Sequence, residues 1–266
     1  MFVTIKSKDN QILKDVRSLA KRKYREAKNK FVLEGKVAVR EALEFALKPS
    51  YVIGTDAFFN REASAPIVAK AKERGVAIYQ VSEKLFNGIA QTEEPQGVLL
   101  VLEKQESNWQ ELTMADNPLW LVVDGLQDPG NLGTIVRTAV AAGVDGLLIT
   151  KQTVDVYNDK TLRSTMGAIF RTKLLQGVMA EDVVAYCKKF SLPIVVADPR
   201  GERPYYQYDF TKGMALVIGS ENQGPGPVLT EHADVRVTIP MPGQMESLNA
   251  AVAAGILLYE RVRQVK

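Results

Sequence analysis

The stretch VRVTIPMPGQMESLNAAVAAGILLYE, residues 235–260, passes from a strand pattern through a loop to a helix pattern and decides the fold. The alternating β-branched residues at its start predict a strand, which the following prolines end because proline cannot donate to a sheet ladder. An Ala- and Leu-rich run with good helix propensity follows, so we expect the hydroxyl of Ser247 to cap this helix. Gly255 costs such a helix about 1 kcal/mol relative to alanine, unless a ligand or another backbone comes close. The stretch is therefore either a simple capped helix or part of a ligand site.

Four long apolar runs precede this stretch: LWLVVDG, VDGLLIT, LPIVVAD and GMALVIGS, which begin at residues 119, 144, 192 and 213. Such runs are typical of strands buried on both faces, and helical patterns such as 134–142 and 181–189 separate them. The alternation predicts a mainly parallel α/β sheet with helices on both sides. Because ligands bind outside the carboxyl ends of parallel strands, we expect a site in the loops after these runs.

Two of these loops are rich in glycine. The first, DGLQDPGNLGT at 124–134, matches neither the GxGxxG dinucleotide fingerprint nor the phosphate-binding loop, which has lysine after its last glycine. The helix that follows buries an apolar stripe and leaves Arg137 off it, free for an anion. The second, SENQGPGP at 220–227, sets Glu221 among glycines and prolines, which can bring backbone groups close to a ligand.

Three segments, LVVDGLQDPGNLGTIVRTAVAAG, LVIGSENQGPG and IPMPGQMESLNAAVAAGILLYE, resemble the three ordered motifs of the SpoU (TrmH-like) RNA 2′-O-ribose methyltransferases of the SPOUT superfamily. The N-terminal part is more loosely similar to the L30e-like RNA-binding domain of that family. The resemblance implies a C-terminal α/β knot, in which the chain threads through a loop to build a pocket for S-adenosylmethionine. It also implies a homodimer that methylates a ribose 2′-oxygen of RNA.

The resemblance and the composition together predict the domain organisation. Residues 1–104 would be a basic N-terminal arm plus an L30e-like substrate-binding domain, with strands at 31–35, 51–54, 76–81 and 97–103. Residues 105–117 have no sustained periodicity and are expected to be a linker. Residues 118–266 would then be the catalytic domain with its trefoil knot.

The basic arm stands out by its charge. Residues 1–30 carry ten lysines and arginines against three acidic residues, so they have a net charge of +7, and the rest of the chain has −4 of the total +3. The basic residues crowd into KRKYREAKNK, at the end of an apolar stripe with helical period. A solvated helix face is one interpretation; a basic cluster around Tyr24 also suits the phosphates of a nucleic acid. The residues expected to contact RNA here are Lys21, Arg22, Lys23 and Arg25.

The resemblance also implies roles for residues in the three motifs. The polar catalytic positions would be Asn131, Arg137, Glu221, Ser247 and Asn249; the donor-binding positions would be Gly219, Ile239, Met241 and Leu248; Arg163 would bind RNA. From the residues alone, helix caps explain Asn131 and Ser247, ion pairs explain Arg137 and Glu221, and core packing explains Ile239 and Leu248. Since a guanidinium with a pKa above about 12 is a poor base, we expect Arg137 to stabilise negative charge and Glu221 to take the proton.

Composition excludes several classes of function. With 46% hydrophobic and 24% charged residues the chain is typical of soluble globular proteins, and no apolar run approaches the 18 or so residues that span a bilayer. The N-terminus lacks the apolar core of a signal peptide, so we expect a cytoplasmic protein. One cysteine and one histidine cannot form a Cys/His metal cluster, so we expect no metal, and His232 lies in a polar turn that is typical of solvated surface.

The resemblance favours large-subunit ribosomal RNA over tRNA as the substrate, because a separate domain precedes the catalytic one. A tRNA 2′-O-ribose methyltransferase remains an alternative. So does a non-catalytic RNA-binding factor of ribosome assembly with a degenerate donor pocket, although the intact polar set favours an enzyme. A weaker third alternative is an α/β enzyme for a small phosphorylated substrate.

Overall fold

The computed structural model describes residues 2–45, 48–104, 108–112, 115–243 and 245–266. The chain divides into two compact units, each with its own sheet: unit 1 contains Met1–Gln105 and Tyr157–Phe170, and unit 2 contains Glu106–Val156 and Arg171–Lys266. Of the predicted linker, residues 105–107 and 113–114 lie outside the described residues. The predicted domain boundaries stay a prediction, and the compact units differ from them by grouping Tyr157–Phe170 with unit 1.

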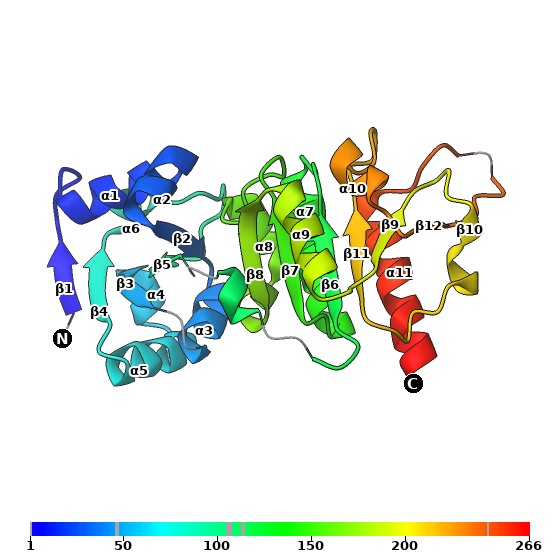
Figure 1. Ribbon diagram of the computed structural model, residues 1–266. Helices are drawn as coiled ribbons and strands as arrows, with labels where there is room; N and C mark the ends of the chain where they lie inside the picture. Colours follow the sequence, from blue (N-terminus) through cyan, green and yellow to red (C-terminus); the bar gives the residue numbers. More distant parts are fainter. Residues whose placement is uncertain (1, 46–47, 105–107, 113–114, 244) are drawn as a thin grey trace. The chain divides into compact units, whose positions relative to one another are not determined.

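Unit 1 contains a mixed five-stranded sheet with the strand order β1-β4-β3-β5-β2 (Figure 1). The pairs β1–β4 and β3–β4 are parallel, whereas β5 runs antiparallel to β2 and β3. The four predicted strands are confirmed as β2 to β5. The elements of unit 1 are β1 (Phe2–Ile5), α1 (Gln11–Leu19), α2 (Arg22–Lys28), β2 (Lys30–Glu34), α3 (Lys36–Glu44), β3 (Pro49–Thr55), α4 (Asp56–Phe59), η1 (Glu62–Ser64), α5 (Ala65–Glu73), β4 (Ala77–Val81), α6 (Glu83–Asn87), β5 (Val98–Glu103), α8 (Asp159–Thr165) and η3 (Ala168–Arg171), the last of which ends one residue into unit 2.

The basic N-terminal segment is an integral part of unit 1. Its first residues form β1, which pairs with β4, and its apolar stripe buries Leu13, Val16 and Leu19 in the core beneath the sheet. The side chain of Asn10 caps α1 by accepting a hydrogen bond from the amide of Ile12 at 2.9 Å. Residues 1–30 therefore supply both an edge strand and part of the core of unit 1.

Unit 2 contains a seven-stranded sheet in which every described pair is parallel, with the order β10-β12-β9-β11-β6-β7-β8. The predicted parallel sheet is confirmed, although β8 and β10 had no counterpart in the prediction. The elements of unit 2 are η2 (Trp109–Glu111), β6 (Leu119–Val123), α7 (Pro129–Ala142), β7 (Gly146–Thr150), β8 (Lys173–Val178), α9 (Ala180–Lys189), β9 (Ile194–Ala197), β10 (Arg203–Pro204), η4 (Tyr205–Gln207), β11 (Met214–Ile218), α10 (Pro227–Glu231), β12 (Val235–Thr238) and α11 (Ala250–Val265).

Helices cover both faces of the unit 2 sheet, as predicted. On one face, α9 and α10 pack over strand residues such as Trp120 and Val122, together with Leu112 from the segment before β6. Side chains alternate along a strand, so Leu121 and Val123 point to the opposite face, where α11 packs against α7 and β11. The sheet is therefore a buried middle layer, which explains why its strands are uniformly apolar.

The register of the sheet brings four strand ends to one edge. Val123 at the end of β6 pairs with Ile218 at the end of β11, and Val237 of β12 pairs with Ala197 at the end of β9. The loops that follow β6, β9, β11 and β12 therefore emerge side by side. The threading of the C-terminal segment into a knot stays a prediction. Within the described ranges no helix is long and apolar enough to cross a membrane.

Candidate active site

A cavity of about 630 Å³ opens among the loops after β9, β11 and β12. Its volume lies within the range of roughly 300–1,000 Å³ that is usual for small-molecule sites. All four residues predicted to bind a methyl donor line it, and so do two of the predicted polar residues: Gly219, Ile239, Met241, Leu248, Glu221 and Ser247. The structure thus brings together residues that are nearly thirty positions apart in sequence.

Gly219 allows the loop after β11 to fold back on itself. A Cβ atom at this position would overlap the backbone of Gly224 and Pro225, so only glycine fits. The returning turn is closed by a hydrogen bond from the amide of Gly224 to the carbonyl of Ser220 at 2.9 Å. As a result, one wall of the cavity consists of closely packed backbone.

The far end of the same loop is anchored by Asp124, the residue after β6. Its buried carboxylate accepts hydrogen bonds from the amide of Gly226 and from the hydroxyl of Thr150, both at 2.7 Å. Thr150 in turn contacts the hydroxyl of Thr153, which donates to the carbonyl of Val123. This buried network ties the glycine-rich loop to two neighbouring strands, and a fully satisfied buried network of this kind is rigid.

Three of the predicted polar residues form one hydrogen-bonded cluster: Asn131 in the first turn of α7, Glu221 in the loop after β11 and Asn249 at the N-cap of α11. The amide of Asn249 donates to Oδ1 of Asn131 at 3.0 Å, and the side chain of Asn131 donates to Oε1 of Glu221. The backbone amide of Ala250, at the start of α11, also donates to this oxygen, at 3.4 Å. No hydrogen bond from the described residues reaches Oε2 of Glu221. The cluster therefore presents one carboxylate oxygen that is held in place but unoccupied.

The helix caps differ from the prediction. Asp128, not Asn131, caps α7, because its carboxylate accepts from the amide of Asn131 at 2.7 Å. Asn249, not Ser247, caps α11, because its Oδ1 accepts from the amides of Ala251 and Val252. The loop continues two residues further than predicted, which frees Ser247 to line the cavity.

Arg137 does not line the cavity. It lies on the exposed side of α7, and within the described part of the chain its guanidinium makes no hydrogen bond or ion pair. The predicted position off the apolar stripe is confirmed: Ile135, Val136 and Ala139 are buried around it. Arg137 is a permanent cation with its donors available for an anion.

Sequence reasoning missed the segment after β9. Asp198, Pro199 and Arg200 line the cavity, and the buried carboxylate of Asp198 accepts from the amide of Arg200 at 2.8 Å. The signal was available, because an apolar strand run ends directly before Asp198 and its carboxyl end is where a ligand would bind.

The predicted RNA-binding residues are of two kinds. Lys21, Arg22 and Lys23 are exposed, and Arg22 pairs with Glu26 one turn later at 2.7 Å. Arg25 is only 5% exposed, and its guanidinium donates to the carbonyls of Leu19 and Ala20. Arg25 thus differs from its neighbours because its helix turns it inward, and its contact with RNA stays a prediction. Arg163 is half-buried and pairs with Asp159 at 2.6 Å.

Cys187 and His232, the lone cysteine and the lone histidine, stand apart from this cavity. Cys187 packs in the core between α9 and the sheet, where burial raises the pKa of its thiol to about 12 and keeps it unreactive. His232 is exposed at the end of α10, as predicted. The described residues contain no group of three His, Cys, Asp or Glu side chains suited to a metal ion.

Comparisons with known proteins agree along nearly the whole chain. The model of the SpoU rRNA Methylase family matches residues 118–259, and that of the MRM3-like substrate binding domain matches residues 10–100. The 23S rRNA (guanosine(2553)-2′-O)-methyltransferase RlmP of Bacillus subtilis is 34% identical over 255 residues, which are 96% of this chain and 97% of that protein.

Two solved structures are similar over the same extent. An AdoMet-bound rRNA methyltransferase from Sinorhizobium meliloti aligns with a TM-score of 0.88 and 30% identity, over 99% of this chain and 98% of that one. The SpoU methyltransferase AviRb from Streptomyces viridochromogenes, in complex with AdoMet, aligns with a TM-score of 0.83 and 28% identity, over 96% and 98%. With a family model that matches more than half of its residues and a relative that matches nearly its full length, this chain belongs to the SpoU rRNA methylase family.

Proposed function

We propose that this protein transfers a methyl group from S-adenosylmethionine (AdoMet) to a ribose 2′-oxygen of large-subunit ribosomal RNA. The observation that carries the proposal is the 630 Å³ cavity bordered by the cluster of Asn131, Glu221 and Asn249. The name of the Bacillus subtilis relative, which specifies 2′-O-methylation of 23S rRNA, and the AdoMet in the two solved structures support it.

The cavity fits the methyl donor chemically. The backbone around Gly219, which a Cβ atom would obstruct, offers N–H and C=O groups to an adenine edge. Ile239, Met241 and Leu248 supply apolar contacts on the same cavity. When bound, the donor supplies a methyl group that is already activated by a positively charged sulfur, so the protein has to orient the nucleophile and help it lose a proton.

Glu221 is the group that we assign to proton removal. Its Oε1 is held by Asn131 and by the amide of Ala250, while Oε2 accepts no hydrogen bond from the described residues. A ribose 2′-hydroxyl that donates to Oε2 would have a positioned base. Arg137, as a permanent cation, would hold the adjacent phosphate and stabilise negative charge developing on the 2′-oxygen.

Unit 1 would hold the RNA. Lys21, Arg22 and Lys23 present three cations on neighbouring positions of the chain, which suits phosphates and not a specific base sequence. A target ribose has to leave a stacked helix to be approached in line, so we expect it in a loop or bulge. An RNA substrate of this kind would place the enzyme in the cytoplasm.

The C-terminal helix supports a homodimer. α11 exposes the apolar side chains of Val252, Tyr259 and Val265, on which a second copy of the chain could pack. Light scattering at micromolar concentration tests this proposal: a dimer mass is expected, and a monomer mass would contradict it.

Two measurements test the activity. Calorimetry with AdoMet should show saturable binding, and its absence would favour a non-catalytic RNA-binding protein. Methylation of ribosomal RNA and of bulk tRNA, each from a strain lacking the enzyme, should place label on a ribose of the large-subunit RNA. Label that enters only tRNA would overturn the choice of substrate, and label on a base would overturn the reaction.

A further inference from the structure

Unit 1 contains a cavity of its own, which the proposed methyl transfer does not use. It has a volume of about 280 Å³, and its walls combine the apolar Leu19 and Val32 with Arg25, Gln91, Tyr157 and Asp159. All of these residues belong to unit 1, because the segment Tyr157–Phe170 folds with it. The ring of Tyr157 packs on Phe31 of β2, with centroids 4.6 Å apart, and Lys104 lies over the same ring. The cavity wall at Tyr157 is therefore held in place by side chains of unit 1.

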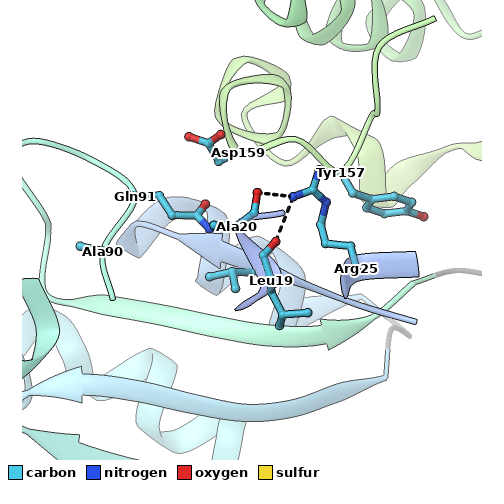
Figure 2. Close-up of a pocket in the computed structure, with 8 residues that line it drawn as sticks. Leu19, Ala20, Arg25, Ala90, Gln91, Tyr157 and Asp159 are labelled. Atoms are coloured by element: carbon cyan, nitrogen blue, oxygen red, sulfur yellow. Dashed lines mark hydrogen bonds between the residues drawn. The ribbon is translucent and has the colours of Figure 1, made fainter. Parts of the chain in front are cut away.

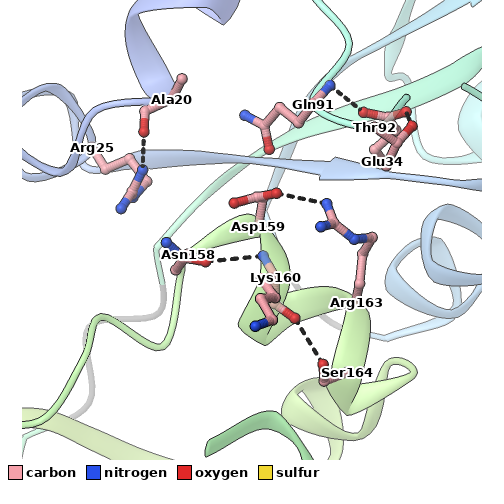
Figure 3. Close-up of polar contacts among 10 residues, drawn as sticks. All are labelled: Ala20, Arg25, Glu34, Gln91, Thr92, Asn158, Asp159, Lys160, Arg163 and Ser164. Carbon is pink, nitrogen blue, oxygen red and sulfur yellow. Dashed lines mark hydrogen bonds and ion pairs between the residues drawn. The ribbon is translucent and has the colours of Figure 1, made fainter. Parts of the chain in front are cut away.

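The charged groups of the cavity are held in place by neighbours. Nη1 of the buried Arg25 donates to the carbonyls of Leu19 and Ala20, each at 2.9 Å (Figure 2). Oδ2 of Asp159 accepts from Arg163 at 2.6 Å (Figure 3). A fixed cation and a fixed carboxylate therefore face the same small space.

The polar edge of the cavity still has hydrogen-bonding capacity. Figures 2 and 3 show Gln91 beside Asp159. The backbone amide of Gln91 is anchored, since it donates to the buried Glu34 at 2.7 Å, but within the described part of the chain its side-chain amide makes no hydrogen bond. Oδ1 of Asp159 likewise accepts no hydrogen bond from these residues. One donor–acceptor amide and one acceptor oxygen are thus available to a ligand.

These groups select the chemistry of the ligand. A phosphate would meet the carboxylate of Asp159 and be repelled, and an aliphatic molecule would leave the side-chain amide of Gln91 and Oδ1 of Asp159 without polar partners. A flat neutral ring with N–H donors and ring acceptors on its edge would pair with Asp159 and Gln91 and would pack against the apolar walls. The volume is just below the range of drug-sized ligands, about 300–1,000 Å³, which suits a single heterocycle.

The residues around the cavity indicate that this heterocycle is a nucleobase. Ala20 lines the cavity, and the exposed cations Lys21, Arg22 and Lys23 follow directly in the chain. A nucleotide would place its phosphates on these cations and its base inside. We propose that this cavity binds one unpaired nucleobase that carries an exocyclic amine, whose hydrogens donate to Asp159 while Gln91 pairs with the adjoining ring atoms. The proposal rests on the proposed RNA substrate, and it assigns unit 1 a base preference.

Binding of short RNA without methyl donor tests the proposal separately from the methyl transfer. Fluorescence anisotropy would be measured for the full chain with labelled hexamers of cytidylate, adenylate and uridylate. Because these strands carry equal phosphate charge, a difference in affinity isolates the base. We expect the cytidylate hexamer to bind about tenfold more tightly than the uridylate hexamer, since uracil has no exocyclic amine to offer a carboxylate.

Two variants and a control separate the cavity from general charge effects. Asp159→Asn should bring the cytidylate-to-uridylate ratio of affinities close to one, and Gln91→Ala should lower it. Asp9→Asn removes an equal charge from unit 1 at a side chain that is 71% exposed and outside the cavity, and should leave the ratio unchanged. Thermal melts identify any variant that fails to fold. If one of the two cavity variants fails, the ratio of affinities measured for the other one tests the proposal.

Equal affinities for the hexamers, or a preference that survives both cavity variants, would overturn the proposed pocket. Neither result would bear on AdoMet binding, which takes place in unit 2. Conversely, a base preference in a protein that binds no AdoMet would retain the pocket and reject the methyltransferase.

Discussion

The two cavities of this protein are built from different material. The cavity of unit 2 is bordered at Gly219 by closely packed backbone, which leaves no room for one added carbon atom. The cavity of unit 1 is less than half as large and is shaped by side chains, with Arg25 and Asp159 as fixed charges. An added side chain would disrupt a wall made of closely packed backbone. In a wall made of side chains, a single substitution can change one hydrogen-bond donor or acceptor and leave the rest in place. The variants below test this contrast.

Gly219→Ala should have the largest effect. Its Cβ would overlap the backbone of Gly224 and Pro225, which cannot move as a side-chain end can, so the loop after β11 has to open. We expect AdoMet affinity to fall by at least about a hundredfold, or about 2.7 kcal/mol, in calorimetry. Affinity for RNA hexamers should persist, because unit 1 is unchanged. Unaltered AdoMet binding would show that the backbone wall is not the donor site.

Asn249→Ala should lower methyl transfer by about ten- to a hundredfold, since it removes the donor that holds Asn131 against Glu221. It also removes the cap of α11, at a cost of about 1 kcal/mol in the free energy of unfolding.

Asn249→Ser is the matched control, because serine caps helices but has no amide. If activity is lost through the polar cluster, Asn249→Ser should melt near the parent temperature and still be slow in single-turnover assays. Full activity in the serine variant would mean that Asn249 acts only as a cap.

Lys21→Ala and Lys23→Ala should each flatten the salt dependence of RNA binding. A lysine that neutralises one phosphate contributes a log–log slope of about −0.7 on single-stranded RNA. The double variant should therefore lose about 1.4 from the slope and keep the preference among hexamers. Deleting residues 1–30 is not a fair test, since it would remove β1 and buried core residues such as Leu13. An unchanged slope would remove these lysines from the RNA interface.

Cys187 offers a pH test of unit 2 alone. Burial raises the pKa of its thiol to about 12 in the folded state, above a value near 8.5 in the unfolded chain. The folded state therefore holds the proton longer, so this contribution to stability is complete below about pH 8.5 and is lost as pH rises towards 12. Denaturant titrations give the free energy of unfolding at each pH. The difference in this free energy between the parent and Cys187→Ser should change with pH in that window and stay constant around neutral pH. The same difference at pH 10 as at neutral pH would contradict a buried Cys187 thiol with a raised pKa.

Gly255→Ala should have the smallest effect and is the control for Gly219. The sequence suggested a close approach at this position, but an added Cβ would meet only Cγ2 of Thr138, at an ordinary 3.8 Å. We expect the free energy of unfolding to rise by up to about 1 kcal/mol through helix propensity, as measured by thermal melting. The AdoMet affinity should be unchanged. Weakened dimer formation would instead show that a second copy packs on this glycine.

Much of the candidate site in unit 2 was predictable because it is encoded locally. A glycine-rich loop after an apolar strand can be recognised from its composition. Residues such as Glu221 and Leu248 were identified from these loops and from the resemblance. The helix caps were not predictable from the same signals. Ser247 and Asn249 are both good capping residues, and the choice between them depends on where the loop meets Asn131.

The sequence by itself determined the parallel sheet, the positions of its strands other than β8 and β10, the exposed position of Arg137 and the loops at the carboxyl edge, because strand and helix periods are properties of neighbouring residues. Only the tertiary structure decided that Arg25 turns inward among exposed cations, that Asp198 lines the cavity of unit 2 and that Tyr157–Phe170 folds with unit 1. Burial and strand register depend on contacts between residues far apart in the chain, and local patterns do not specify those contacts.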